Sequence, residues 1–342
     1  MKKVLLTLLQ LVVTIAVLYW VFQDKEKRAQ MASALRLADY RWIAAAIAAY
    51  IVVEIAAAVR WQVLLKVQGI NLSFLRVSAL FIIGMFYNQF LPGGTGGDII
   101  KTYLLLKETA DKKAGALLAV VFDRVIGLVA LISITGALIA LRYHWLTQTR
   151  ETSQLVLVLL AVLGSSILAL VTSFIVSGFN LLHRLPLHFP LRDKLIELSA
   201  AYHLYARHWR ATAAAFIASL VAHLGTFATF LFVAYAFRAS VFVVDFFAVM
   251  PIERTISSLP ISFAGVGLRE KVLQVMLHGL CGVPEAVAAL IGSMSFLVML
   301  LCCLPGGIVY FFYKPSGETH HVKLREMQRE VATLEHEITG ES

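Results

Sequence analysis

Residues 88–101 have the sequence NQFLPGGTGGDIIK and interrupt an apolar segment that otherwise covers about 74–107. A helix cannot continue through Pro92 and the glycines after it, because proline lacks an amide donor and glycine is entropically costly in a helix. Non-helical backbone at membrane depth is tolerated only inside protein or beside a water-filled cavity. The stretch therefore predicts a broken, re-entrant helical hairpin over about 74–107.

A second apolar segment, about 241–280, is interrupted in the same way. Its break runs from Leu259-Pro260 to Gly265-Val266-Gly267, and in both segments glycine is followed by charged residues and a helix start. Each hairpin lies between two full spans and forms one unit with them. The expected topology makes these two units antiparallel. Paired broken helices in an inverted repeat are typical of transporters whose substrate site lies where those helices meet.

The composition of the whole chain agrees with a lipid environment. Of its 342 residues 59% are hydrophobic and 15% are charged, and the mean hydropathy is +0.80. The apolar stretches are rich in Leu, Ala and Val without strand-like alternation, so they predict helices rather than a barrel. The full spans are expected at about 4–22, 42–63, 114–141, 154–177, 210–237 and 284–313. The fold class is thus an all-α polytopic membrane protein with about six full transmembrane helices and two broken hairpins that form an inverted repeat.

The chain divides into a transmembrane unit, 1–313, and a charged cytoplasmic tail, 314–342. Within the transmembrane unit, the first repeat covers about 42–141 and the second about 210–313, with an amphipathic cytoplasmic connector at about 179–209. The first apolar stretch is expected to be a retained span, because no small-residue cleavage site follows it. The distribution of Lys and Arg favours both termini inside, although loop 23–41 carries cations on the outer side.

Ionisable side chains within lipid are costly, so they are the first candidates for a functional site. Carboxylates after the breaks could simply cap helix starts, whereas the accompanying cations oppose the helix dipole and need an anionic partner. That partner is either an internal carboxylate or a lipid phosphate. Glu54 and Arg60 are also ionisable residues within a predicted span, but they are not among the candidate substrate-binding residues. The candidate substrate-binding residues are Asn88, Gly96, Gly97, Asp98, Lys101, Asp123, Arg124, Glu253, Arg254, Gly267, Arg269 and Glu270.

Other chemistries find little support in the sequence. No nucleophile elbow, zinc-protease motif or phosphate-binding loop occurs, so we expect no enzyme, no metal and no cofactor. The net charge of +9 is spread over loops without an aromatic-interleaved patch, which argues against nucleic acid as a partner. Arg60 and Trp61 lie near a predicted span end and are interpreted as interfacial anchors. His223, alone within a span, is interpreted as a packing residue.

Three blocks of sequence carry a family resemblance. The stretch from Asn88 to Asp98 with Lys101, the block 123–128 and the block 259–270 resemble the lysylphosphatidylglycerol synthase transmembrane-region family over most of 1–315. The third block departs at 261–264, where that family commonly has a proline-glycine run. The resemblance implies a flippase-like domain. In the multiple peptide resistance factors, a similar domain translocates aminoacylated phosphatidylglycerol made by a separate cytosolic synthase domain.

The tail 314–342 is too short to hold such a synthase, so we expect a stand-alone member without lysyl transfer. The expected function is movement of an anionic or aminoacylated phospholipid, or of a related lipid such as a hopanoid or glycolipid, between leaflets. An accessory subunit that presents lipid to a lipid-modifying or glycosyl-transfer enzyme is the alternative, and an ion channel is a third. Expected partners are membrane lipids and a cytosolic lipid-modifying enzyme in the bacterial inner membrane. The oligomeric state is left open, a dimer included.

Overall fold

The structure is a computed structural model that describes residues 25–90, 96–109, 112–178, 192–258 and 262–314. These residues form helices and contain no strand, which confirms the predicted all-α class. Four predictions lie outside the described residues: the first span, the tips of both breaks, the first part of the connector and the tail. Five helical stretches in the described part are long and apolar enough to cross a membrane: Tyr40–Val67, Lys113–Leu146, Arg150–Ser173, Trp209–Ala236 and Glu285–Phe312.

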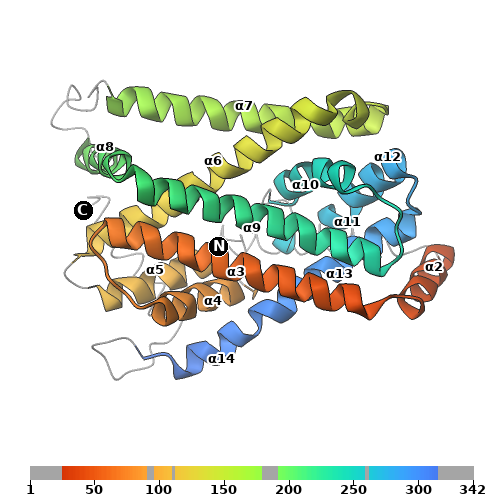
Figure 1. Ribbon diagram of the computed structural model, residues 1–342, viewed down its shortest axis with the longest axis horizontal. Coiled ribbons are helices and arrows are strands. Elements are labelled where there is room, and N and C mark those ends of the chain that lie inside the picture. The colour runs from red at the N-terminus through yellow and green to blue at the C-terminus, as the bar shows by residue number, and fades with distance from the viewer. Residues whose placement is uncertain (1–24, 91–95, 110–111, 179–191, 259–261, 315–342) are drawn as a thin grey trace, which may run out of the picture.

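Two long antiparallel helices, α3 (Tyr40–Val67) and α9 (Trp209–Ala236), form the axis of the molecule (Figure 1). The amide of Asp39 donates to the carbonyl of Ala236, which joins the start of α3 to the end of α9. The helices approach closely because small residues line the contact. A Cβ atom on Gly225 would lie 2.8 Å from Val53 Cγ2.

The two interrupted segments flank this axis at opposite ends (Figure 1). The first contains α4 (Phe74–Phe90) and α5 (Gly96–Glu108). The second contains α10 (Val243–Ser257), a 3-10 turn (Phe263–Gly265), α11 (Leu268–Leu273), a π turn (Gln274–His278) and α12 (Gly279–Cys281). Both segments are interrupted at the positions that their proline and glycine residues predict.

The outer helices complete the bundle. Helix α6 (Lys113–Leu146) packs against α3 and α9, and α7 (Arg150–Gly178) lies on the outside of the molecule (Figure 1). Two short helices, α2 (Lys25–Arg36) and α8 (Arg192–Arg207), precede α3 and α9. In α8, the Tyr205 hydroxyl donates to the carbonyl of Leu64, and burial raises the pKa of Tyr205 to about 12.

The predicted span 284–313 is divided into α13 (Glu285–Cys303) and α14 (Pro305–Phe312). Pro305 begins the second helix because it lacks an amide donor. Gly306 then lets α14 contact α4, since a Cβ atom there would lie 2.2 Å from the carbonyl oxygen of Ile82. The close approach of α14 to α4 therefore depends on a glycine that the span prediction did not consider.

A hydrogen-bonded cluster joins α14 to the first hairpin and provides a test of this packing. The Tyr313 hydroxyl donates to Glu108 Oε1 at 2.7 Å, and Arg76 Nη1 donates to Glu108 Oε2 at 2.7 Å. Burial and the hydrogen bond to Glu108 raise the pKa of Tyr313 above its usual range. Tyr313→Phe should lower stability by about 1.5–3 kcal/mol, the usual loss for a hydrogen bond to a charged group. Thermal unfolding in detergent measures this, with the exposed Tyr143→Phe as control; equal melting temperatures would contradict it.

Candidate functional site

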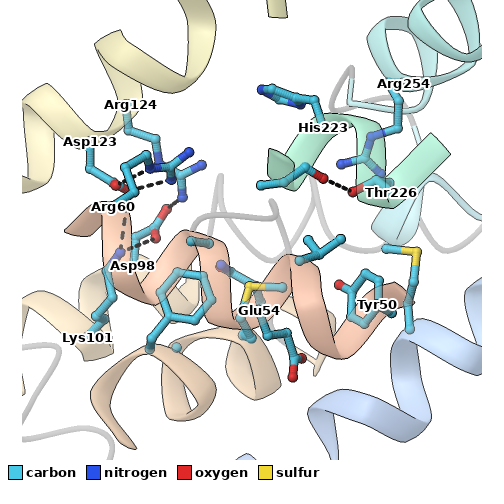
Figure 2. A pocket seen from close by; sticks show the side chains of 18 residues that line it. Tyr50, Glu54, Arg60, Asp98, Lys101, Asp123, Arg124, His223, Thr226 and Arg254 are labelled. Atoms are coloured by element: carbon cyan, nitrogen blue, oxygen red, sulfur yellow. Dashed lines mark hydrogen bonds and ion pairs between the residues drawn. The ribbon is translucent and has the colours of Figure 1, made fainter. Parts of the chain in front are cut away.

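A cavity of about 210 Å³ lies between the first hairpin, the α3–α9 pair and α10 (Figure 2). Helices α6 and α13 also contribute to its wall, so residues from distant parts of the chain meet there. Apolar side chains such as Val53, Met85 and Met299 line part of it. Its polar and charged lining residues are Tyr50, Glu54, Arg60, Asn88, Asp98, Lys101, Asp123, Arg124, His223, Thr226 and Arg254.

One side of the cavity carries a network of five charged residues, which we name the first-hairpin network: Arg60, Asp98, Lys101, Asp123 and Arg124. Arg60 donates to both oxygens of Asp123, from Nε at 2.7 Å and from Nη2 at 3.0 Å. Lys101 Nζ lies 3.9 Å from Asp123 and 3.7 Å from Asp98. Arg124 pairs with Asp98. The network holds three cations and two carboxylates, so it has a positive excess.

Lys101 is held within the protein rather than at a membrane surface. Its side chain is 4% exposed, and Nζ lies 4.5 Å from the centre of the Trp61 ring. The ring face stabilises the ammonium group by a cation–π interaction. Lys101 of α5 thus places a cation against an aromatic residue of α3.

The interpretation of Arg60 and Trp61 as interfacial anchors was wrong. Trp61 is 0% exposed, and the Arg60 side chain is 12% exposed and ion-paired to Asp123. The physical reason is the length of α3, which continues to Val67 instead of ending near residue 63. Both residues therefore lie inside the bundle, where Arg60 needs a carboxylate from α6.

The residues around the first break brace the hairpin as well as line the cavity. The amide of Gly97 donates to Asn88 Oδ1 at 2.9 Å, which joins α5 to α4 across the break. Gly97 is also packed directly against Gly84 of α4. Gly96 begins α5, and Asp98 lies in its first turn. Asn88, Asp98 and Lys101 lie on the cavity wall.

Arg254 of α10 lies on the opposite side of the cavity from the first-hairpin network (Figure 2). In the described ranges, no carboxylate forms an ion pair with Arg254. The other acids of α10 form ion pairs with different cations: Asp245 pairs with Arg142 at 2.7 Å, and Glu253 pairs with Arg269. Arg254 is therefore a partly buried cation that faces the cavity without a described counter-ion.

The other predicted residues of the second hairpin do not line this cavity. Glu253 lies 3.4 Å from Arg269 Nε, and both side chains are buried. The Arg269 guanidinium group lies 5.0 Å from the centre of the Phe296 ring. Glu270 accepts from the amide of Gly267 at 2.6 Å, as a capping carboxylate does. The structure thus brings Glu253, Arg269, Glu270 and Gly267 together in a separate cluster, as internal pairing and capping predict.

The structure adds cavity residues that the sequence analysis did not select: Tyr50, Glu54, Arg60, His223 and Thr226. His223 Nε2 lies 3.0 Å from the carbonyl oxygen of Gly127, so this nitrogen carries the proton and Nδ1 is left unprotonated in the neutral ring. On α3, the lining residues are spaced three and four apart, which places them on one helix face. That spacing is the sequence signal that could have revealed the cavity residues of α3. No group of three metal-ligating side chains is found in the described part of the chain.

Comparison with known proteins gives a family for most of the chain. The family model of the lysylphosphatidylglycerol synthase TM region matches residues 7–307. The UPF0104 membrane protein PH1989 of Pyrococcus horikoshii is 30% identical over 173 residues, which are 50% of this chain and 48% of that protein. The chain thus spans about half the length of this curated relative. No solved structure matches. This protein therefore belongs to the lysylphosphatidylglycerol synthase transmembrane-region family.

Proposed function

We propose that this protein binds the phosphate of an anionic membrane lipid in the cavity and moves that lipid between the leaflets. The observation that carries the proposal is Arg254, a cation that faces the cavity without a carboxylate partner in the described residues. A guanidinium group is suited to phosphate because its donors form a fork that matches two phosphate oxygens. The first-hairpin network supplies further cations on the opposite side.

The charge of the cavity wall supports an anionic ligand. Four cations (Arg60, Lys101, Arg124 and Arg254) face three carboxylates (Glu54, Asp98 and Asp123), so the wall has one positive charge in excess when all ionise. Of these four cations, Arg124 is the most accessible, with a side chain that is 61% exposed. It is therefore suited to meet an incoming headgroup before Arg254 binds it.

The size of the cavity favours a headgroup over a whole lipid. A volume of about 210 Å³ accommodates a phosphate with a small polar substituent, while the acyl chains would stay in the surrounding membrane. The family supports lipids as the ligand class. Aminoacylated phosphatidylglycerol is a narrower variant of this proposal, whereas a hopanoid or glycolipid headgroup without a phosphate would be a different class of ligand.

The arrangement of the two hairpins supports movement. They lie at opposite ends of the α3–α9 axis, and each is interrupted where its helix could bend (Figure 1). In our proposal they form an inverted pair of re-entrant hairpins in a multi-pass inner-membrane protein with both termini in the cytoplasm. Alternate opening at either end would expose the bound headgroup to one leaflet and then to the other.

A liposome assay with fluorescent phosphatidylglycerol tests the proposal. The wild-type protein should accelerate exchange between leaflets, and Arg254→Gln should slow it about tenfold or more, because a hydrogen bond to a charged group is lost. Arg150→Gln, on the exposed start of α7, is the matched control and should leave the rate unchanged. Lack of acceleration by the wild-type protein would refute transport. Binding without movement would instead fit a lipid-presenting subunit of a membrane enzyme.

A further inference from the structure

Glu54 differs from the other acids of the cavity wall. It lies in the middle of α3 with 8% of its surface exposed, and it lines the cavity. Asp98 and Asp123 each pair with two cations, whereas Glu54 forms no ion pair with any described Lys, Arg or His. It accepts a hydrogen bond from the buried thiol of Cys303 at 3.7 Å. A thiol is a weak donor, so the carboxylate is poorly stabilised in its charged form.

The surroundings of Glu54 explain why it has no cationic partner among the described residues. Helices α3, α5, α6, α9 and α10 bring titratable groups to the cavity wall: Tyr50, Arg60, Asp98, Lys101, Asp123, Arg124, His223 and Arg254. Helix α13 adds Cys303, which contacts Glu54 outside that wall, and its neighbour Cys302. Of the cations, Arg60, Lys101 and Arg124 are held by the two aspartates. Arg254 is the cation that remains, and Glu54 does not contact it in this arrangement (Figure 2). A buried carboxylate without a cationic partner is most stable with a proton bound.

We propose that Glu54 is a proton-binding site that couples headgroup binding to proton movement. When the phosphate binds Arg254, Glu54 holds a proton on its carboxyl oxygen and faces Cys303. When the phosphate leaves, Glu54 releases that proton to the aqueous solution and its carboxylate becomes the counter-ion of Arg254. One proton and one phosphate charge would therefore move together. This inference rests on the proposed function, since it requires an anionic ligand at Arg254.

The linkage between pH and affinity tests the proposal on the purified full chain in detergent. The probe is dihexanoyl-phosphatidylglycerol, with inorganic phosphate in a parallel arm. Only protonated Glu54 favours the bound state, so raising the pH should weaken wild-type binding, up to tenfold per pH unit for one linked proton. In mildly alkaline, weakly buffered solution, binding should take up protons. Glu54→Gln should bind without pH dependence or proton uptake, Glu54→Asp should retain both, and Glu151→Gln, exposed on α7, should match the wild type.

Carbodiimide labelling of the protein saturated with dihexanoyl-phosphatidylglycerol gives a second reading, because the bound state is the one in which Glu54 holds its proton. This reagent modifies protonated carboxyl groups in apolar surroundings, so peptide mass spectrometry should find it on Glu54 and not on Asp98 or Asp123 at slightly acidic pH.

The outcomes separate the two proposals. Phosphatidylglycerol binding with the same pH dependence in Glu54→Gln as in the wild type, or no labelling of Glu54, would overturn the proton site alone. No binding of either probe would overturn both proposals. Proton-linked binding of inorganic phosphate, equal to that of the lipid, would support the proton site and refute the lipid as ligand.

Discussion

Asp123→Asn should destabilise the protein by about 3–5 kcal/mol, the usual cost of removing one partner of a buried ion pair. Asp123 accepts both hydrogen bonds of the Arg60 fork and lies 3.9 Å from Lys101. Asparagine has almost the same shape, so packing is preserved while two buried cations lose a counter-ion. The measurement is the melting temperature of the purified protein in detergent, together with its yield from the membrane.

Two further variants identify the cause of that loss. The double variant Arg60→Met with Asp123→Leu should recover much of the stability, because it removes both buried charges and retains apolar volume. Arg142→Gln breaks a more exposed pair with Asp245 and should cost about 1 kcal/mol or less. If Asp123→Asn were no more harmful than Arg142→Gln, the first-hairpin network would not be the buried structure described above.

Gly97→Ala should be the most harmful methyl addition in the first hairpin. A Cβ atom on Gly97 would lie 1.8 Å from the carbonyl oxygen of Gly84 and 2.7 Å from the amide nitrogen of Asn88. These are backbone atoms, so no rotamer change can relieve the overlap, and α5 must move away from α4. We expect a loss of about 3 kcal/mol or more, at the upper end for overpacking. Because Lys101 follows on α5, lipid exchange should also fall in any protein that still folds.

The control is a glycine in a helix with free space around it. Among the described residues, no atom lies within 4 Å of a Cβ added to Gly164 of α7, so Gly164→Ala should be neutral or stabilising by about 0.5–1 kcal/mol. Thermal unfolding of the two variants side by side is sufficient. A Gly97→Ala protein as stable as Gly164→Ala would show that the two arms of the first hairpin are not in contact at this position.

Local sequence signals predicted the helices and their breaks well. Proline and glycine act on the backbone directly, so the interruptions after Phe90 and Ser258 needed no tertiary information. Asp98, Lys101, Asp123 and Arg124 could be selected as candidates because they are charged residues in apolar surroundings, and the structure places all four on the cavity wall. The division of the last span after Leu304 was harder to predict from the sequence, because the contact of Gly306 with Ile82 depends on the packing of α14 against α4.

Pairing between helices could not be predicted from the sequence. Arg60 and Asp123 are 63 positions apart, and only the packing of α3 on α6 brings them together. For the same reason, Arg269 was assigned to a shared site although its carboxylate partner, Glu253, lies on the adjacent helix α10. Glu54 and His223 were underestimated because neither lies in the blocks 88–101, 123–128 or 259–270, and the cavity that they line appears only after folding.

Photo-cross-linking in native membranes tests the central claim, headgroup binding at Arg254, most directly. A phosphatidylglycerol analogue with a diazirine in its headgroup would be activated by light, and the labelled peptides identified by mass spectrometry. We expect labels on cavity residues such as Tyr50, Ala222 and Met85, and their loss in Arg254→Gln or with excess unlabelled lipid. Labels confined to lipid-facing residues of α7 such as Leu157 and Leu168, unchanged in Arg254→Gln, would contradict it.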